Sequence, residues 1–346
     1  MWGGKRVVIT GHTGFKGAWL SELLTTFGAH VHGISLAPHA TPNLFTDANL
    51  VQIMKSHNIL DIRDYISLER AMSEIQPDFV FHLAAQSTVS TGYKLPRQTF
   101  EINTTGTVNV LMSSLSSHSL QGIFCATTDK VYENHFNTNE KIESDHLGAK
   151  DPYAASKVSA EFAIESMLYL FQERKIPLAV GRAGNVIGGG DWGPNRLIPD
   201  AVKSVIDNSV LNVRSPNSTR PWQHVLDCLS GYLLVANHIM KKEQSTPLEI
   251  YNFGPEKSLT VQEVLEILRK QLAFTWEIRP DSTVGHEHNQ LSLNSYKAKS
   301  QLGWKCQFGG NSSIEETASW YEDFIAGQNA HTLMKSSIER FLKDEK

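Results

Sequence analysis

The sequence predicts an α/β protein with a doubly wound parallel sheet, on three observations. Short apolar runs typical of buried strands alternate six times with segments of helical periodicity over residues 5–182. The first strand is followed at once by a glycine-rich turn and a helical pattern. With 346 residues, 40% of them hydrophobic and 20% charged, the chain can bury a large core. We therefore expect a Rossmann-like sheet domain over residues 1–182 and a smaller α/β domain over residues 183–346.

Each expected element follows from periodicity and from its flanking residues. The expected strands are 5–10, 30–35, 78–86, 122–127 and 177–182, with a short strand and turn at 59–64. The expected helices between them are 18–27, 64–75, 96–115 and 151–173. Residues 37–56 are expected to be an irregular insertion and residues 280–290 a surface loop. Later helices are expected at 226–241, 260–272 and 312–325, the second opened by a Thr260 and Glu263 capping box. A segment near 220–255 is expected to return to the sheet.

Composition excludes several classes of protein. The net charge of -4 comes without long blocks of like charge, so we expect neither a nucleic-acid nor a membrane-surface partner. No signal peptide or membrane-spanning run is found, which favours a cytoplasmic location. Cys125, Cys228 and Cys306 lack the close spacing of a disulfide framework or a zinc site. His30 and His32 share one strand face without a third ligand, so no metal is predicted.

The glycine-rich turn after the first strand predicts dinucleotide binding. Gly11 permits the tight turn, Gly14 lets the backbone approach a pyrophosphate, and Gly17 lets helix and sheet pack closely. The helix N-terminus then faces the phosphates. The predicted cofactor-binding residues of this turn are Gly11, His12, Thr13, Gly14, Phe15, Lys16 and Gly17.

The cofactor is predicted to be NAD, because the expected adenosine end of the site has no cation to hold the 2′-phosphate of NADP. The second strand should end near an acid that binds the adenosine ribose, yet there is no Asp or Glu between Glu22 and Asp47. There is also no Lys or Arg between Lys16 and Lys55 to hold a 2′-phosphate. Residues 83–86, Leu-Ala-Ala-Gln, end the fourth expected strand, and their small side chains let a cofactor lie against the backbone. Leu83, Ala84, Ala85 and Gln86 are therefore predicted cofactor contacts.

The chemistry is predicted to centre on Tyr153 and Lys157, one helical turn apart on the same face. A nearby ammonium should lower the pKa of the phenol and suit it to remove a proton from an alcohol. Thr128 ends a buried strand, where open α/β sheets bind ligands, and its hydroxyl can hold the same alcohol oxygen. Asp129 and Lys130 add an acid and a base that simple alcohol oxidation does not need, which suggests a second chemical step.

After residue 182 the chain becomes loop-rich and dotted with arginines. Three consecutive glycines at 188–190 are usually a flexible turn, but beside Arg196, Arg214 and Arg220 they suggest a substrate that carries phosphate. Arg220 is the predicted contact to a diphosphate.

The G-x-x-G-x-x-G turn combined with Tyr-x-x-x-Lys resembles the extended short-chain dehydrogenase/reductase family. Residues 10–17, 42–45, 82–86, 128–130, 151–153, 182–192, 196–200 and 220–225 resemble the group of that family that dehydrates CDP-glucose. Lys130 is one of the distinguishing residues, because dTDP-glucose dehydratases carry Glu there. The chain departs from the group at Ser87–Ser90, where an arginine close to the substrate is usual.

The resemblance implies further contacts and an assembly. It implies that Asp61 and Ile62 contact the adenine, that Thr127, Tyr153 and Lys157 contact NAD, and that residues 183–346 mainly bind a nucleotide sugar. The substrate-binding residues it implies are Asn185, Arg196, Leu197, Arg214 and Arg220. It also implies a homodimer in which helices 96–115 and 151–173 pair across a two-fold axis.

The implied reaction is the redox-neutral 4,6-dehydration of CDP-D-glucose to a CDP-4-keto-6-deoxy sugar. Tyr153 takes the C4 hydroxyl proton, Lys130 removes the C5 proton, and Asp129 protonates the departing C6 hydroxyl. Such products feed bacterial surface polysaccharides such as the O-antigen of lipopolysaccharide. The alternatives are a nucleotide-sugar 4-epimerase, a dehydratase of another nucleotide-hexose, and a cofactor sensor without catalysis.

Overall fold

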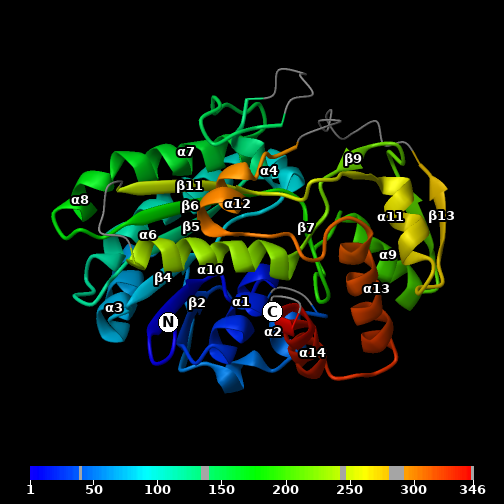
Figure 1. The fold of residues 1–346 in the computed structure, drawn as a ribbon, viewed down its shortest axis with the longest axis horizontal. Helices are drawn as coiled ribbons and strands as arrows, with labels where there is room; N and C mark the ends of the chain where they lie inside the picture. The colour runs from blue at the N-terminus through cyan, green and yellow to red at the C-terminus, as the bar shows by residue number, and fades with distance from the viewer. Residues whose placement is uncertain (39–40, 134–139, 242–246, 280–291, 344–346) are drawn as a thin grey trace.

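A seven-stranded parallel sheet forms the centre of the molecule in the computed structural model, which describes residues 1–38, 41–133, 140–241, 247–279 and 292–343 (Figure 1). The strand order is β11-β6-β5-β4-β1-β2-β3. The strands are β1 (Arg6–Thr10), β2 (His30–Ser35), β3 (Ser56–Ile59), β4 (Phe79–His82), β5 (Ile123–Thr128), β6 (Leu178–Ala183) and β11 (Leu248–Phe253). The order runs outward in both directions from the β1 and β4 pair, so the predicted doubly wound sheet is confirmed.

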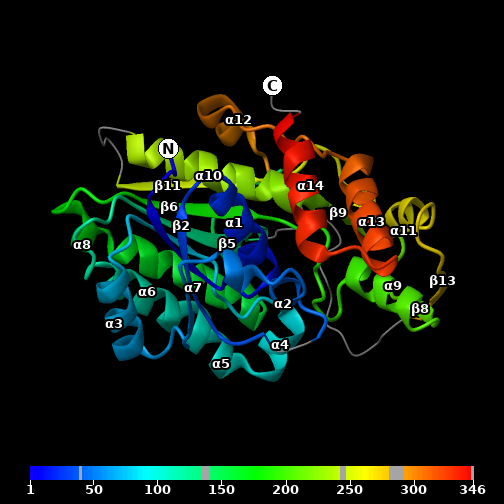
Figure 2. The same ribbon diagram turned by 90° about the horizontal axis from the view of Figure 1, so that it is seen from below.

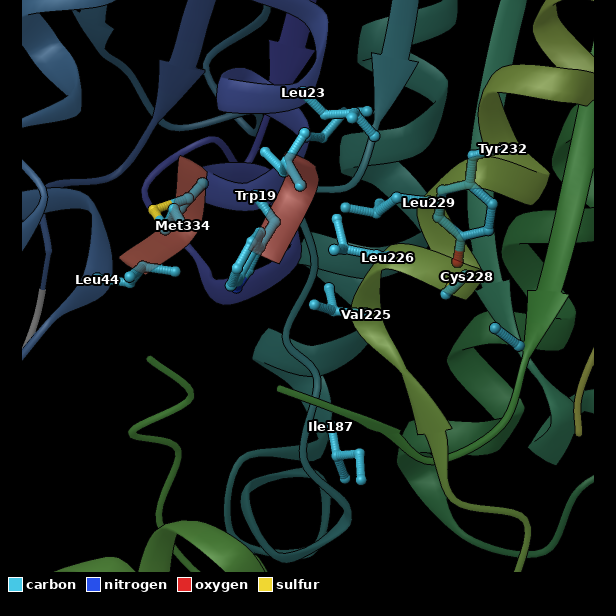
Figure 3. Packing of buried hydrophobic residues seen from close by; sticks show 14 of the residues in the cluster. Trp19, Leu23, Leu44, Ile187, Val225, Leu226, Cys228, Leu229, Tyr232 and Met334 are labelled. Atoms are coloured by element: carbon cyan, nitrogen blue, oxygen red, sulfur yellow. The ribbon is translucent and has the colours of Figure 1, made fainter. Parts of the chain in front are cut away.

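Alternating strand residues divide the core between the two faces of the sheet. Val7 and Ile9 belong to the cluster shared with α1 (Phe15–Thr26) and α10 (Val225–Lys241), whereas Val8 belongs to the cluster on the opposite face. That opposite face is covered by α3 (Tyr65–Ile75), α6 (Gly106–Ser114) and α7 (Pro152–Ser166). Figure 3 shows the first cluster, where Trp19 of α1 lies near Leu226 and Leu229 of α10. Both faces are covered, which explains why the strands are continuous apolar runs.

A smaller lobe lies beyond the carboxyl ends of the strands (Figures 1 and 2). It contains α9 (Leu197–Ile206), α11 (Val261–Leu268), α13 (Asn311–Ile325) and three two-stranded sheets. These sheets pair β7 (Val186–Ile187) with β10 (Gln223–His224), β9 (Thr219–Arg220) with β12 (Leu259–Thr260), and β8 (Val210–Val213) with β13 (Thr275–Ile278). The predicted capping box of Thr260 and Glu263 opens α11.

Two later segments come back to the sheet domain. Strand β11 pairs in parallel with β6, and α10 packs beneath the same sheet. The last helix, α14 (Ala330–Lys343), packs on α1, where His331 Nε2 lies 2.8 Å from the Glu22 carboxylate. Between α10 and α11 the chain thus crosses from one lobe to the other, and α12 (Tyr296–Leu302) packs on β11. No helix of the described residues is both long and apolar enough to cross a bilayer.

Several expected boundaries were wrong, each for a local reason. The third strand, 56–59, ends where the short strand and turn at 59–64 was expected to begin, and the expected turn follows it, with the Arg63 amide donating to the Asp61 carboxylate. Residues 37–56 are not wholly irregular, since Asn43 caps a short helix, α2 (Leu44–Asp47), which a 3-10 turn, η1 (Leu50–Ile53), follows. Helix α1 begins three residues earlier than expected, so the glycine turn runs directly into it. The expected loop at 280–290 lies outside the described residues.

The helix expected at 96–115 is interrupted by a π-helical turn, η2 (Glu101–Thr105), between α5 (Pro96–Phe100) and α6. A π-turn inserts one residue into a helix and marks functional sites more often than chance. Likewise, the helix expected at 151–173 divides into α7 and the short α8 (Leu168–Gln172). Periodicity alone does not reveal such breaks, because the flanking segments keep their apolar spacing.

Candidate active site

The glycine turn closes tightly at the point where the strand order reverses. Gly11 has a φ of 82°, and a Cβ there would lie 2.7 Å from the Ala84 amide nitrogen. A Cβ on Gly17 would lie 2.2 Å from the Gly11 carbonyl oxygen. Leu83 and Ala84 are held beside this turn, since the Leu83 amide donates to the Thr10 carbonyl and the Ala84 amide to the Thr10 hydroxyl. A Cβ at Gly11 or Gly17 would meet backbone atoms, so these glycines allow the close approach that a bound pyrophosphate requires.

The first turn of α1 is open to an anion. Its N-cap residue, Gly14, supplies no side chain to accept from the helix amides. Unpaired amides and the positive end of the helix together make an anion site. The geometry of Gly11, Gly14 and Gly17 therefore fits the diphosphate of a dinucleotide. Phe15 and Lys16 point elsewhere: the Phe15 ring reaches Gly188, and the Lys16 ammonium donates to the Tyr232 hydroxyl at 3.3 Å.

The adenosine end of the turn carries hydroxyls and imidazoles instead of a carboxylate. Thr13 Oγ1 lies 2.8 Å from Ser35 Oγ, at the end of β2 where the ribose-binding acid was missing from the sequence. The buried His12 ring stacks over Gly33 and pairs with His57, with 2.6 Å between Nε2 and Nδ1. Burial and the nearby His57 lower the pKa of His12 to about 4, so this ring adds no positive charge at neutral pH.

The residues expected at the adenine follow β3. The Asp61 carboxylate receives the Arg63 guanidinium at 2.6 Å, and this pair lines a shallow cavity of about 410 Å³. Arg63 lowers the pKa of Asp61, which therefore stays ionised. Ile62 is buried and packs against Gly106 of α6. The cavity is a surface feature, separate from the groups that carry the predicted chemistry.

Tyr153, Thr128 and Asp129 lie close together at the end of β5. Asp151 caps α7 through the Ala154 amide at 3.0 Å, which sets Tyr153 in the first turn. Thr128 Oγ1 donates to Asp129 Oδ1 at 3.0 Å, and both residues lie close enough to the Tyr153 phenol to influence its pKa. Immediately after Thr128 the chain enters a 3-10 turn, η3 (Asp129–Val131). Because of this turn, the Asp129 side chain lies on the same side of the chain as that of Thr128. In an extended strand the two side chains would point to opposite faces.

The expected effect of Lys157 on the phenol is wrong for the protein without ligand. Burial raises the pKa of Tyr153 to about 12, and the charge of Asp129 adds to the shift. Lys157 Nζ donates to the Ala126 carbonyl at 3.2 Å instead of lying against the phenol. Burial and the nearby Lys16 lower the pKa of Lys157 to about 8. Helical spacing places the two residues on one face, but tertiary contacts decide where the long lysine side chain ends.

Asp129 and Lys130 complete this end of the site. Burial raises the pKa of Asp129, while Lys130, the Thr128 hydroxyl and Lys16 oppose the shift. The Lys130 backbone amide donates to Thr128 Oγ1 at 3.3 Å. No ion pair within 4.0 Å joins the Lys130 ammonium to a carboxylate of the described residues. Lys130 is therefore not a fixed partner of Asp129 in this structure.

A buried ionic network beside the candidate catalytic residues was missed by sequence reasoning. Arg182 Nη2 contacts Glu161 at 2.5 Å, and Glu161 also accepts from the Thr127 hydroxyl at 2.6 Å. Arg182 Nη1 donates to the Tyr132 hydroxyl at 2.7 Å, which in turn donates to Asn252 of β11. The network thus joins both ends of the segment 127–132 to α7 and the sheet. Its only signal in the sequence was a charged residue at the end of an apolar strand.

Asn103, inside the π-turn, was also missed. Its side chain accepts from the Gln86 amide at 2.8 Å and donates to Ser156 Oγ at 2.8 Å. Ser156 then donates to the Tyr153 carbonyl at 2.7 Å. The loop after β4, the π-turn and the start of α7 are therefore tied together by one buried amide. Gln86 and Ala85 are held in place by this contact rather than by a strand.

The predicted substrate residues lie in the smaller lobe and in the segment after β6 that leads into it. Arg196 Nη1 lies 2.8 Å from Asp191, and Nη2 lies 3.5 Å from Ser87 Oγ in the segment that departs from the resembling group. Leu197 is the first residue of α9. Asn185 lies between β6 and β7, and its carbonyl accepts from the Gln223 amide. Arg220 is half-buried in β9, whereas Arg214 is exposed.

The three glycines at 188–190 have a packing function. A Cβ on Gly189 would lie 1.9 Å from the Trp320 ring, and one on Gly190 would lie 2.5 Å from Leu44. The Gly189 carbonyl also accepts from the Trp19 indole at 3.0 Å. These close contacts fasten α13 of the smaller lobe to α1 and α2. The expectation of a phosphate-carrying substrate therefore rests on the arginines alone.

The fold is that of a dinucleotide-dependent enzyme of the short-chain dehydrogenase/reductase type. Three features define it: a doubly wound sheet, a glycine turn at the switch point of that sheet, and a helix beside β5 that carries Tyr-x-x-x-Lys. Residues 7–254 match the model of the NAD dependent epimerase/dehydratase family. The chain belongs to this family.

Individual relatives agree with this assignment. The chain is 37% identical to a CDP-glucose 4,6-dehydratase of Salmonella typhimurium, over 99% of this chain and 97% of the relative. It is 25% identical to DesIV, a dTDP-glucose 4,6-dehydratase of Streptomyces venezuelae solved with NAD and TYD bound, with a TM-score of 0.78 over 92% of this chain and 97% of that one. The UDP-glucose 4-epimerase of Thermus thermophilus, solved with NAD, has a TM-score of 0.78 at 23% identity, covering 91% of this chain and 98% of that one. This last likeness supports the fold alone.

Proposed function

We propose that the protein is an NAD-dependent 4,6-dehydratase that converts CDP-D-glucose to CDP-4-keto-6-deoxy-D-glucose. The observation that carries the proposal is the turn at Asp129, which places an acid beside the Thr128 and Tyr153 pair. An oxidoreductase or a 4-epimerase needs the tyrosine and the threonine but has no use for this carboxyl group. The relative with 37% identity, a CDP-glucose 4,6-dehydratase, supports the same reaction.

NAD, when bound along the glycine turn, would accept a hydride from C4 of the sugar and return it to C6. Tyr153 removes the C4 hydroxyl proton, and Thr128 holds that oxygen in place. The resulting ketone acidifies the C5 hydrogen, which Lys130 removes as a base. Asp129 protonates the C6 hydroxyl so that it leaves as water. Its burial favours the protonated form that this step requires.

In this proposal the two lobes bind different ligands. Residues 1–182 hold the cofactor, with the glycine turn at the diphosphate and Lys157 at the nicotinamide ribose. Residues 183–346 mainly hold the nucleotide sugar through Asn185, Leu197 and the three arginines, although β11 and α10 are part of the sheet domain. Arg196 approaches both Ser87 and Tyr153, so it is placed to contact the sugar or its nearest phosphate.

The decisive experiment is a side-by-side assay with CDP-, dTDP-, UDP- and GDP-glucose. A 4-keto-6-deoxy product forms an enone in alkali that absorbs near-ultraviolet light, and we expect it with CDP-glucose. A 4-epimerase yields no such absorbance, and a cofactor sensor consumes none of the four compounds. Strong activity with a different nucleotide would move the proposal to that substrate.

The Lys130→Met variant tests the second chemical step. Losing the base should stop elimination but leave the first oxidation intact, so turnover should fall by about 10²–10⁴-fold. The variant should accumulate reduced cofactor on adding substrate and should exchange no C5 hydrogen with deuterated solvent. Normal turnover and exchange would remove Lys130 from the mechanism.

We also propose a cytoplasmic homodimer that supplies deoxy sugars for a bacterial surface polysaccharide. The helices expected to pair carry large exposed apolar residues: Phe162 of α7 is 54% exposed, Tyr169 of α8 65%, and Phe100 of α5 37%. Such residues on adjoining helices favour an interface with a second copy. Light scattering should give the mass of a dimer, and a stable monomer at micromolar concentration would contradict the proposal.

A further inference from the structure

The carboxyl group of Asp129 lies in a pocket that segments from both lobes complete. In the elimination step proposed above, the Asp129 proton moves to the C6 oxygen and the C6–O bond breaks, so that water leaves while the C5 proton passes to Lys130. Asp129 must therefore reach this step protonated. A carboxyl group keeps its proton near neutral pH only where it is shielded from water. The residues that shield Asp129 thus bear directly on the reaction.

One wall of the pocket follows from the pairing of β5 with β6. Thr128 and Ala183, the last residues of these strands, are partners in the parallel register, so Asp129 and Gly184 leave the sheet side by side. A Cβ on Gly184 would lie 3.3 Å from Asp129 Oδ2 and 3.8 Å from its Cγ. Because a methyl group there would crowd the carboxyl group, the glycine provides the room that this group occupies.

A second wall comes from the smaller lobe. The same Cβ on Gly184 would lie 3.2 Å from Pro221 Cγ, so the proline ring packs against the glycine that faces the acid. Pro221 is buried between β9 and β10. The Gln223 amide donates to the Asn185 carbonyl at 2.9 Å, which ties the segment after the proline to the segment after the glycine.

On the basis of the proposed dehydration, we propose that Gly184 and Pro221 are positioning residues that form the pocket of the acid, Asp129. Gly184 lets the carboxyl group lie beside Thr128, and Pro221 covers the glycine and keeps water away from that group. The sheet domain supplies the acid, and the smaller lobe supplies the cover. That cover is the neighbour of Arg220, the predicted contact to the diphosphate, so substrate binding and shielding of the acid involve the same segment.

The enclosure of Asp129 agrees with this role. The residue is 4% exposed, and burial raises its pKa against the opposing effects of Lys130, the Thr128 hydroxyl and Lys16. Opening the pocket to water weakens the effect of burial and should lower this pKa. The acid would then lose its proton at a lower pH, and the alkaline limit of elimination should move in the same direction.

The first experiment adds a methyl group at the pocket. Gly184→Ala should displace the Asp129 carboxyl group and slow elimination by about 10-fold or more, within the ~10²–10⁴-fold that a positioned acid contributes. Oxidation at C4 should continue, so reduced cofactor should accumulate after CDP-glucose is added.

Gly254→Ala is the matched control. Gly254 also directly follows a strand of the central sheet, β11, and a Cβ there would lie 3.2 Å from Leu293 instead of the acid. This variant should turn over normally and accumulate no reduced cofactor. Equal losses in the two variants, or normal turnover in Gly184→Ala, would overturn the role of Gly184.

The second experiment removes the cover without crowding the pocket, and it also tests the proposal if Gly184→Ala does not fold. Pro221→Ala should move the alkaline limb of the kcat profile to lower pH by about 1 unit. Thermal unfolding checks that the variant is folded. A change confined to KM would assign Pro221 to substrate binding and overturn its role at the acid, as would an unshifted alkaline limb.

The natural enzyme separates this proposal from the one on which it rests. If it dehydrates none of the four nucleotide sugars, the proposed function fails. If it dehydrates CDP-glucose while Gly184→Ala and Pro221→Ala keep its turnover and pH dependence, the inference about the pocket fails alone.

Discussion

Two arginine–carboxylate pairs lie beside the candidate active site and differ in the exposure of the arginine and in the number of its partners. Arg182 and Glu161 are 2% and 4% exposed, and the guanidinium also donates to Tyr132 and to the Glu143 carbonyl. The Arg196 side chain is 36% exposed, and beyond Asp191 its one further partner among the described residues is the Ser87 hydroxyl at 3.5 Å. The N–H donors of Arg182 are bonded within the fold, whereas Arg196 has donors left that could bind a ligand. Burial and the number of partners, more than the charge itself, distinguish a structural arginine from a binding one.

The largest expected effect on stability comes from breaking the buried pair. Glu161→Gln leaves the Arg182 charge buried without its counter-ion and should lower the free energy of unfolding by about 3–5 kcal/mol. Urea denaturation measures this loss. Asp191→Asn, the matched change in the second pair, should cost less, because the Arg196 side chain is 36% exposed and its charge can be solvated after the counter-ion is lost. Equal losses in the two variants would contradict the distinction drawn between the pairs.

The second prediction concerns binding instead of stability. Arg220→Ala should raise the KM for the nucleotide sugar by an amount equivalent to about 2–5 kcal/mol, because a truncated charge contact leaves a phosphate unpaired. Unfolding should change little. Arg220→Lys serves as the control, because it keeps the charge but loses the bidentate geometry. Its KM should lie between that of the natural protein and that of Arg220→Ala. An unchanged KM in Arg220→Ala would exclude contact with the diphosphate.

Lys157 provides an intermediate case, since it is buried with a carbonyl for a partner instead of a direct carboxylate ion pair. Its pKa is lowered from 10.5 to about 8 in the folded protein, so folding works against its charged form. This cost is fully present below about pH 8 and disappears as the pH rises past 10.5. Lys157→Met should therefore stabilise the cofactor-free protein by about 3 kcal/mol at neutral pH, with little gain at high pH.

The measurement for Lys157→Met is urea denaturation at several pH values. The same variant should lose activity, because the nicotinamide ribose loses its proposed contact. A variant that is less stable than the natural protein at neutral pH would show that the ammonium is favourably solvated after all.

The smallest effect is expected at the exposed pair of Arg97 and Glu101, one helical turn apart on α5 and η2. The Arg97 side chain is 92% exposed, so water and salt screen the pair. Arg97→Ala should change the free energy of unfolding by about 0.3–0.5 kcal/mol and leave KM unchanged. A loss as large as that of Glu161→Gln would show that this surface is buried in the assembled protein.

The strands and the glycine turn could be predicted from sequence because their signals are local. The β-branched run at residues 6–10 and the glycines after it are dictated by backbone geometry within a dozen residues. The position of Tyr153 at the start of a helix follows in the same way from Asp151 and Pro152. These signals do not depend on the rest of the fold.

The missing parts of the prediction depend on contacts between distant segments. Glu161 and Arg182 are 21 residues apart, and Tyr132 reaches Asn252 across 120 residues. Nothing near Lys157 in the sequence indicates that its ammonium meets the Ala126 carbonyl, and the expected effect on Tyr153 failed for that reason. The π-turn around Asn103 had no periodic signal, and the partner of its side chain, the Gln86 amide, lies 17 residues away.

The π-turn also constrains how this helix can change in length. One inserted residue rotates everything after it by about 100° relative to a regular helix. Residues before the turn can therefore face α7 while Val110 and Leu111 still face the sheet. A substitution here alters one contact, but deleting a single residue would restore a regular helix and turn one of its two faces to solvent. Among descendants of this chain, we expect the segment 96–114 to vary in composition while its residue count stays fixed.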